Sequence, residues 1–126
     1  MMNKIIKTDK APAAIGPYSQ AVLAGNTLYI SGQLAINPAT GKIVDGGIQT
    51  QTEQILKNIG VILEEAGFTY ADVVKSTCLL ADMGDFKSMN EVYAKYYPTN
   101  SPARCAYAVK DLPMGGLVEI ETIAVK

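Results

Sequence analysis

The 126-residue sequence predicts a single α+β domain spanning residues 1–126, in which two helices cover one face of a mixed β-sheet. Short β-rich runs alternate with two stretches that have helical hydrophobic spacing. The length suits one domain, and folding should bury about two-thirds of the surface of the unfolded chain. Two helices leave the other sheet face uncovered, so an apolar composition of 48% hydrophobic residues predicts an oligomer.

The first half of the chain predicts an edge strand, a hairpin and a long helix. Residues 4–8 are expected to form the edge strand, and a loop follows at 11–17. Strands at 18–23 and 27–31 flank Gly25-Asn26, a typical hairpin signal. The helix follows Gly46-Gly47 and ends at Gly67; its apolar stripe consists of Ile55, Ile59, Ile62, Leu63 and Ala66.

The second half predicts one helix between strands. Residues 72–80 carry apolar side chains on both faces, which favours a central strand covered on each side. Strands at 105–109 and 117–125 are expected to pair as an antiparallel hairpin through residues 112–116. Between these strands, helical spacing links Phe86, Met89, Tyr93 and Tyr96, and Pro98 ends the pattern.

Composition excludes several kinds of chemistry. The chain has no histidine, so Ser-His-Asp and Cys-His catalysis and HExxH zinc sites are ruled out. Cys78 and Cys105 form no CxxC motif, and both are expected to be reduced, buried thiols. The net charge of −1 argues against nucleic-acid binding. The glycine-rich motifs that bind nucleotide cofactors are missing. The N-terminus does not resemble a signal peptide, so we expect a cytoplasmic protein.

One cation and one pair of carboxylates stand out. Arg104 is the only arginine among 11 cationic residues, and its planar fork of donors suits a carboxylate ligand. Glu119 and Glu121 interrupt the apolar face of the last strand, where two close carboxylates can divide acid and base roles. A structural ion pair and a solvated strand face are the alternative interpretations. Lys75 is the one candidate for Schiff-base chemistry.

The segments at 11–20 (APAAIGPYSQ), 31–33 (SGQ), 102–104 (PAR) and 118–121 (VEIE) together resemble the Rid family, also called YjgF, in its RidA branch. The resemblance covers essentially the whole chain. It implies a chorismate-mutase-like fold and a homotrimer with a central β-barrel and clefts between subunits. It also implies hydrolysis of enamine or imine acids, such as 2-aminoacrylate and 2-iminopropanoate, to a 2-keto acid and ammonia, without cofactor or metal.

The resemblance also assigns roles to residues. Arg104 would bind the substrate carboxylate, and Glu119 would position or activate water. Many relatives have a cleft cysteine where this chain has Ala106, so only a backbone contact is expected there. The remaining residues expected to line the cleft are Tyr18, Ser31, Gly32, Phe86 and Asn90.

Two other functions fit the same motifs. The first is a non-catalytic binder or sensor of small carboxylic or keto acids, which would use the same arginine and cleft. The second is an endoribonuclease or translation inhibitor, a label carried by some relatives. The slightly negative net charge and the single arginine argue against strong affinity for RNA.

Overall fold

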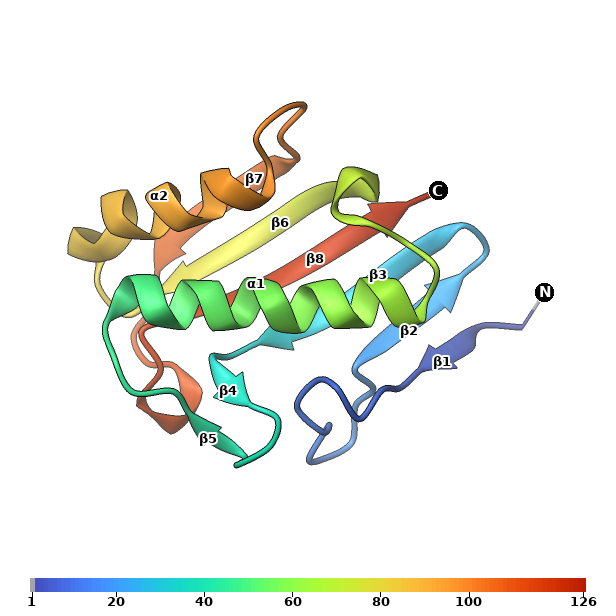
Figure 1. Cartoon of the computed structure of the whole chain (residues 1–126), viewed down its shortest axis with the longest axis horizontal. Helices are drawn as coiled ribbons and strands as arrows, with labels where there is room; N and C mark the ends of the chain where they lie inside the picture. Colours follow the sequence, from blue (N-terminus) through green and yellow to red (C-terminus); the bar gives the residue numbers. More distant parts are fainter. Residues whose placement is uncertain (1) are drawn as a thin grey trace.

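Six strands form one mixed sheet in the order β1–β2–β3–β8–β6–β7 (Figure 1). The computed structural model describes residues 2–126. Neighbouring strands in this sheet are antiparallel except β6 and β7, which are parallel; β4 and β5 form a separate ribbon. The strands are β1 (Lys4–Ile6), β2 (Ala21–Ala24), β3 (Thr27–Gln33), β4 (Ile36–Asn37), β5 (Lys42–Ile43), β6 (Val73–Leu80), β7 (Ala103–Ala108) and β8 (Val118–Val125).

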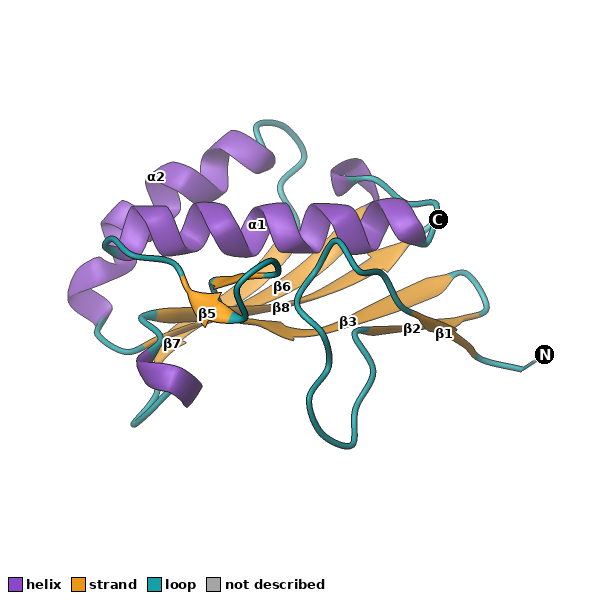
Figure 2. Cartoon of the chain, turned by 60° about the horizontal axis from the view of Figure 1, so that its bottom comes forward, coloured by secondary structure: helices purple, strands orange, loops and turns teal. Residues whose placement is uncertain are grey.

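Two helices, α1 (Ile48–Glu65) and α2 (Phe86–Tyr96), pack side by side on one face of the sheet, as predicted (Figure 2). Four members of the predicted apolar stripe are fully buried, because they recur at helical spacing: Ile55, Ile59, Ile62 and Leu63. The fifth, Ala66, follows the last residue of α1 and is half-buried. Gly67 follows the helix with a φ of +81°, which confirms the predicted left-handed termination. Short 3-10 turns occupy Tyr70–Asp72, Met83–Asp85 and Pro113–Gly115.

The predicted hairpin between the last two strands is wrong. β7 pairs in parallel with β6, and β8 lies between β3 and β6 (Figure 1). A parallel pair needs a long crossover, and α2 supplies it between β6 and β7. The segment after β7 then carries the chain past β6 into the middle of the sheet. The short connection at residues 112–116 therefore joins β7 and β8 although these two strands are not neighbours in the sheet.

Several strand boundaries differ from those predicted. The edge strand expected at 4–8 ends at Ile6, and the strand expected at 105–109 covers Ala103–Ala108. The strand expected at 18–23 begins only at Ala21, because Tyr18, Ser19 and Gln20 belong to the loop that precedes it. The strand expected at 27–31 continues to Gln33 through a β-bulge, where the register with β8 shifts. The small residues Ser31 and Gly32 lie at this bulge.

The sheet face away from the helices, which we call the open face, is not covered within this chain (Figure 2). The prediction that strand 72–80 is covered on both sides is therefore wrong for a single copy of the chain. Lys75 on this strand is exposed, so it lacks the desolvation that Schiff-base chemistry needs. Cys78 is buried on the helix face, but Cys105 is exposed, contrary to the prediction that both are buried. Large apolar side chains on this face are exposed at Ile5, Tyr29, Tyr107 and Val125.

Among the described residues, neither helix combines the length and the hydropathy that crossing a membrane would require.

Candidate functional site

Arg104 lies near the start of β7, and its side chain contacts residues of α2. Its Nη1 donates a hydrogen bond to Asn90 Oδ1 at 2.6 Å. The guanidinium carbon lies 5.4 Å from the centre of the Phe86 ring and 4.9 Å from that of Tyr93. The hydrogen-bond partner is a neutral amide, so it fixes the guanidinium without neutralising its charge. An arginine has five N–H donors, which leaves enough for a bidentate carboxylate.

Tyr93 contacts Arg104, although from the sequence it was predicted only as part of the apolar pattern of the second helix. Phe86, Asn90 and Tyr93 are spaced four and three residues apart, which places them on one face of α2. Two of the three had been expected in the site from the resemblance. Their helical spacing is the signal from which Tyr93 could also have been predicted.

Ala106 lies on the same face of β7 as Arg104, and its partner in the sheet register is Cys78. This neighbouring thiol does not replace the cleft cysteine of the relatives. Burial raises the pKa of Cys78 to about 11, and the charge of Arg104 lowers it only in part. The thiol is therefore protonated near neutral pH and is not a nucleophile.

Glu119 lies on β8, and its carboxylate extends across the backbone of Gly32 in the β3 bulge. A methyl group on Gly32 would overlap Glu119 Oε2, and it would lie 3.1 Å from Cδ and 3.3 Å from Cγ. Gly32 is therefore the residue type that leaves room for this carboxylate.

The pKa of Glu119 is raised above its ordinary value. Partial burial is the larger cause, and the negative charge of Glu121 adds to it. The two side chains lie on one face of β8, two residues apart. Glu121 is exposed, whereas Glu119 is half-buried. A carboxylate with a raised pKa accepts and returns a proton more readily near neutral pH, which suits a general base.

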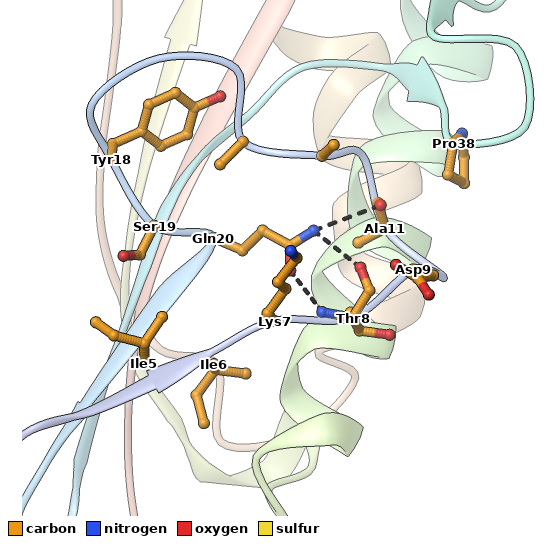
Figure 3. A pocket seen from close by; sticks show the side chains of 12 residues that line it. Ile5, Ile6, Lys7, Thr8, Asp9, Ala11, Tyr18, Ser19, Gln20 and Pro38 are labelled. Atoms are coloured by element: carbon orange, nitrogen blue, oxygen red, sulfur yellow. Dashed lines mark hydrogen bonds between the residues drawn. The ribbon is translucent and has the colours of Figure 1, made fainter.

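Ser31 directly precedes Gly32, beside which this carboxylate lies, and Tyr18 belongs to the loop that leads into β2. Ser31 Oγ donates a hydrogen bond of 2.6 Å to the Ser19 carbonyl, which joins the loop of Tyr18 to the bulge. Tyr18 and Ser19 line a cavity of about 420 Å³ (Figure 3). Ser19 and Ser31 also border a hollow of about 290 Å³ that contains Glu121. The loop between β1 and β2 projects past the open face (Figure 2).

The expected site residues form two groups on opposite faces of the sheet. In the register of the sheet, Arg104 lies beside Ser76, and Glu119 lies beside Leu79. Ser76 and Leu79 are three residues apart on β6, so their side chains point to opposite faces. Arg104 is therefore on the helix face and Glu119 on the open face. This excludes the alternative in which the two meet within one hairpin.

We call these groups the arginine group (Phe86, Asn90, Arg104 and Ala106) and the glutamate group (Tyr18, Ser31, Gly32 and Glu119). The arginine group can bind a small organic anion, and the glutamate group can orient water and move a proton. Among residues 2–126, no three side chains of the kinds that ligate metals are gathered together.

Comparisons with known proteins match the whole chain. The model of the family described as Endoribonuclease L-PSP matches residues 8–126. A Bos taurus protein named 2-iminobutanoate/2-iminopropanoate deaminase is 56% identical over 126 residues, which are 100% of this chain and 92% of that protein. The Homo sapiens protein of the same name is 50% identical, with the same coverage of 100% and 92%.

Solved structures agree with these matches. The structure of RidA from an Antarctic Psychrobacter is 49% identical and superposes with a TM-score of 0.94, covering 98% of this chain and 99% of that chain. Escherichia coli TdcF with bound serine is 39% identical, with a TM-score of 0.93 and coverage of 98% of each chain.

Proposed function

The chain belongs to the Rid (YjgF) family, and on this basis we propose that it is a hydrolytic deaminase of reactive enamine and imine acids. Its substrates are 2-aminoacrylate, 2-iminopropanoate and related 2-imino acids, and its products are a 2-keto acid and ammonia. The observation that carries the proposal is a charged guanidinium fixed by a neutral amide and two rings, with donors left for a carboxylate. We retain the cytoplasmic location expected from the sequence.

In the proposed reaction, Arg104 binds the substrate carboxylate and thereby fixes the position of the neighbouring C=N carbon. Glu119 accepts a proton from a water molecule as its oxygen attacks that carbon. The electron pair of the C=N bond moves to nitrogen, which takes a proton. The resulting carbinolamine then collapses: its hydroxyl proton is transferred to the nitrogen, the C–N bond breaks, ammonia leaves, and the carbonyl of the keto acid forms. An enamine substrate first takes a proton at its methylene carbon to become the imine.

This reaction suits a site without histidine, because water attacks an activated C=N bond readily. Orientation by the carboxylate can supply several kcal/mol, and a general base contributes roughly 10²–10⁴-fold. The raised pKa of Glu119 supports the second role, since a stronger base takes the proton of water more easily.

We further propose that the site forms between copies of the chain, in a homotrimer. The arginine group and the glutamate group lie on opposite faces of one sheet, so one copy cannot bring Arg104 and Glu119 together around a small substrate. The open face exposes the apolar side chains of Tyr29 and Tyr107, which a second copy would cover. In this arrangement, the arginine group of one subunit faces the glutamate group of the next.

The direct test is to generate 2-aminoacrylate with a dehydratase and to follow the loss of imine and the release of keto acid. We expect the purified protein to accelerate hydrolysis, and we expect Arg104→Ala to lose on the order of 10²-fold in kcat/KM. Arg104→Lys keeps the charge but lacks the bidentate fork, and it should recover only part of this loss. The absence of acceleration, or full activity in Arg104→Ala, would refute the proposal.

A non-catalytic binder of small acids is the alternative, and a relative that was crystallised with bound serine supports testing it. Glu119→Gln separates the two functions: it should abolish hydrolysis and leave keto-acid binding largely intact. If neither the wild type nor Glu119→Gln hydrolyses the imine, and both bind a keto acid in a way that depends on Arg104, the binder is favoured. For the endoribonuclease alternative, RNA cleavage that an Arg104 variant abolishes would be the supporting result.

A further inference from the structure

The buried side chain of Gln20 spans the loop that carries Tyr18. It is 4% exposed, and both ends of its amide are occupied by loop backbone (Figure 3). Its Oε1 accepts a hydrogen bond from the Thr8 N–H at 2.7 Å. Its Nε2 donates to the carbonyl oxygens of Thr8 at 3.0 Å, Pro12 at 2.8 Å and Ala11 at 3.4 Å. A side chain at the end of the loop thus satisfies backbone groups at its beginning, in residues 8–12.

The same segment is tied to the β3 bulge from the other side. Ser31 donates twice: its N–H to the Gln20 carbonyl at 3.0 Å and its hydroxyl to the Ser19 carbonyl at 2.6 Å. Ser31 precedes Gly32, across which the Glu119 carboxylate lies. Gln20 therefore connects the loop with the backbone that supports the glutamate group.

Packing alone does not fix Tyr18. Its side chain is 53% exposed, and the residues around it, 7–20, contain no helix or strand. A local turn closes just before it, where the Tyr18 N–H donates to the Gly16 carbonyl at 2.9 Å. The direction in which Tyr18 points thus depends on where the loop is held, and the hydrogen bonds of Gln20 hold it.

We propose that Gln20 is a positioning residue that sets the place of Tyr18 in the glutamate group. The inference rests on the proposed function, because it takes Tyr18 to line the substrate cleft. Gln20 does not touch the substrate; it acts through the backbone of residues 8–12 and through its neighbours in sequence. A loss of its amide would loosen the loop and let Tyr18 adopt several positions.

The test is Gln20→Met, which keeps the length and shape of the side chain but none of its hydrogen bonds. We expect kcat/KM for the imine to fall on the order of tenfold, mainly through KM, which is less than the ~10²-fold cost of displacing a reacting group by 1 Å. In a Tyr18→Ala background, the same substitution should change kcat/KM less than about twofold, because residues that act as one unit are not additive.

Hydrogen exchange gives a second readout that does not depend on turnover. Backbone amides of residues 9–17 should exchange faster in Gln20→Met than in the wild type. Tyr70→Phe is the matched control: it removes a hydrogen bond of 2.6 Å to the Leu56 carbonyl, remote in sequence from both groups, and should leave KM unchanged. If Gln20→Met does not fold, Gln20→Glu serves instead, because it keeps the acceptor for Thr8 and puts a carboxyl oxygen in place of the amide donors.

Additive effects of the Tyr18 and Gln20 substitutions would overturn the proposal, as would unchanged exchange in residues 9–17. If the wild type does not hydrolyse imines, the proposed function fails first. Faster hydrogen exchange in Gln20→Met would then show that Gln20 stabilises the loop but has no role in catalysis, and the positioning role would be refuted.

Discussion

Gly32→Ala should separate activity from stability. The φ of Gly32 lies outside the left-handed region, so alanine fits the backbone without strain. Its methyl group would overlap the Glu119 carboxylate, with Cδ 3.1 Å away, and the flexible carboxylate end would have to turn aside. The displacement should cost about 10²-fold in kcat/KM, as expected when a general base moves by about 1 Å.

The effect of Gly32→Ala on folding should be small, because two contributions oppose each other. Turning the Glu119 side chain away from its rotamer costs about 0.5–1.5 kcal/mol. Replacing glycine by alanine restricts the unfolded chain and returns about 0.4–1 kcal/mol. We therefore expect the free energy of unfolding in urea to change by less than about 1 kcal/mol.

The measurement compares kcat/KM with urea unfolding for Gly32→Ala, Glu119→Gln and the double variant. Gly47→Ala is the matched control, because a methyl group there meets nothing within 4 Å, and its activity should stay at the wild-type level. Wild-type activity in Gly32→Ala would refute the reasoning. A further large loss on adding Gly32→Ala to Glu119→Gln would also refute it, because the methyl group would then act on something other than Glu119.

Three further predictions concern the pH profile, the thiols and the core. Glu121→Gln removes the charge that helps to raise the pKa of Glu119, so the acid limb of kcat/KM should shift to lower pH; an unchanged limb contradicts this. At neutral pH a thiol reagent should reach Cys78, which is buried and whose pKa is raised to about 11, only after unfolding, as counted by mass spectrometry; labelling of Cys78 in the folded protein would contradict this. Gly60→Ala should destabilise α1 by roughly 1–3 kcal/mol in urea unfolding, because the methyl group would overlap Tyr70; a gain in stability would contradict the overlap.

The sequence predicted those parts of the fold that depend on local patterns. The helix stripes, the termination at Gly67 and the edge strand follow from periodicity and from single residue types. Arg104 could be singled out because no other arginine is present. The burial expected for Cys105 was wrong, because strand alternation places its side chain on the face opposite Ala106, which this chain leaves uncovered.

Strand order could not be predicted in the same way. The hydrophobic alternation of β8 is equally consistent with a hairpin beside β7 and with a central position between β3 and β6. The position of β8 in the sheet matters for the candidate site, because in the observed order Glu119 lies on the face opposite Arg104. The role of Gln20 was also hidden, since a glutamine after a loop has no local pattern that reveals which backbone groups it bonds.

The central claim is that Arg104 of one copy works with Glu119 of another. Arg104→Ala and Glu119→Gln should each be inactive alone. Co-expressed in equal amounts and purified as mixed assemblies, they should regain about a quarter of wild-type activity, because each half of an intersubunit site is intact in about half of the copies. Activity no higher than that of either parent, in assemblies shown to contain both variants, would contradict a site shared between subunits.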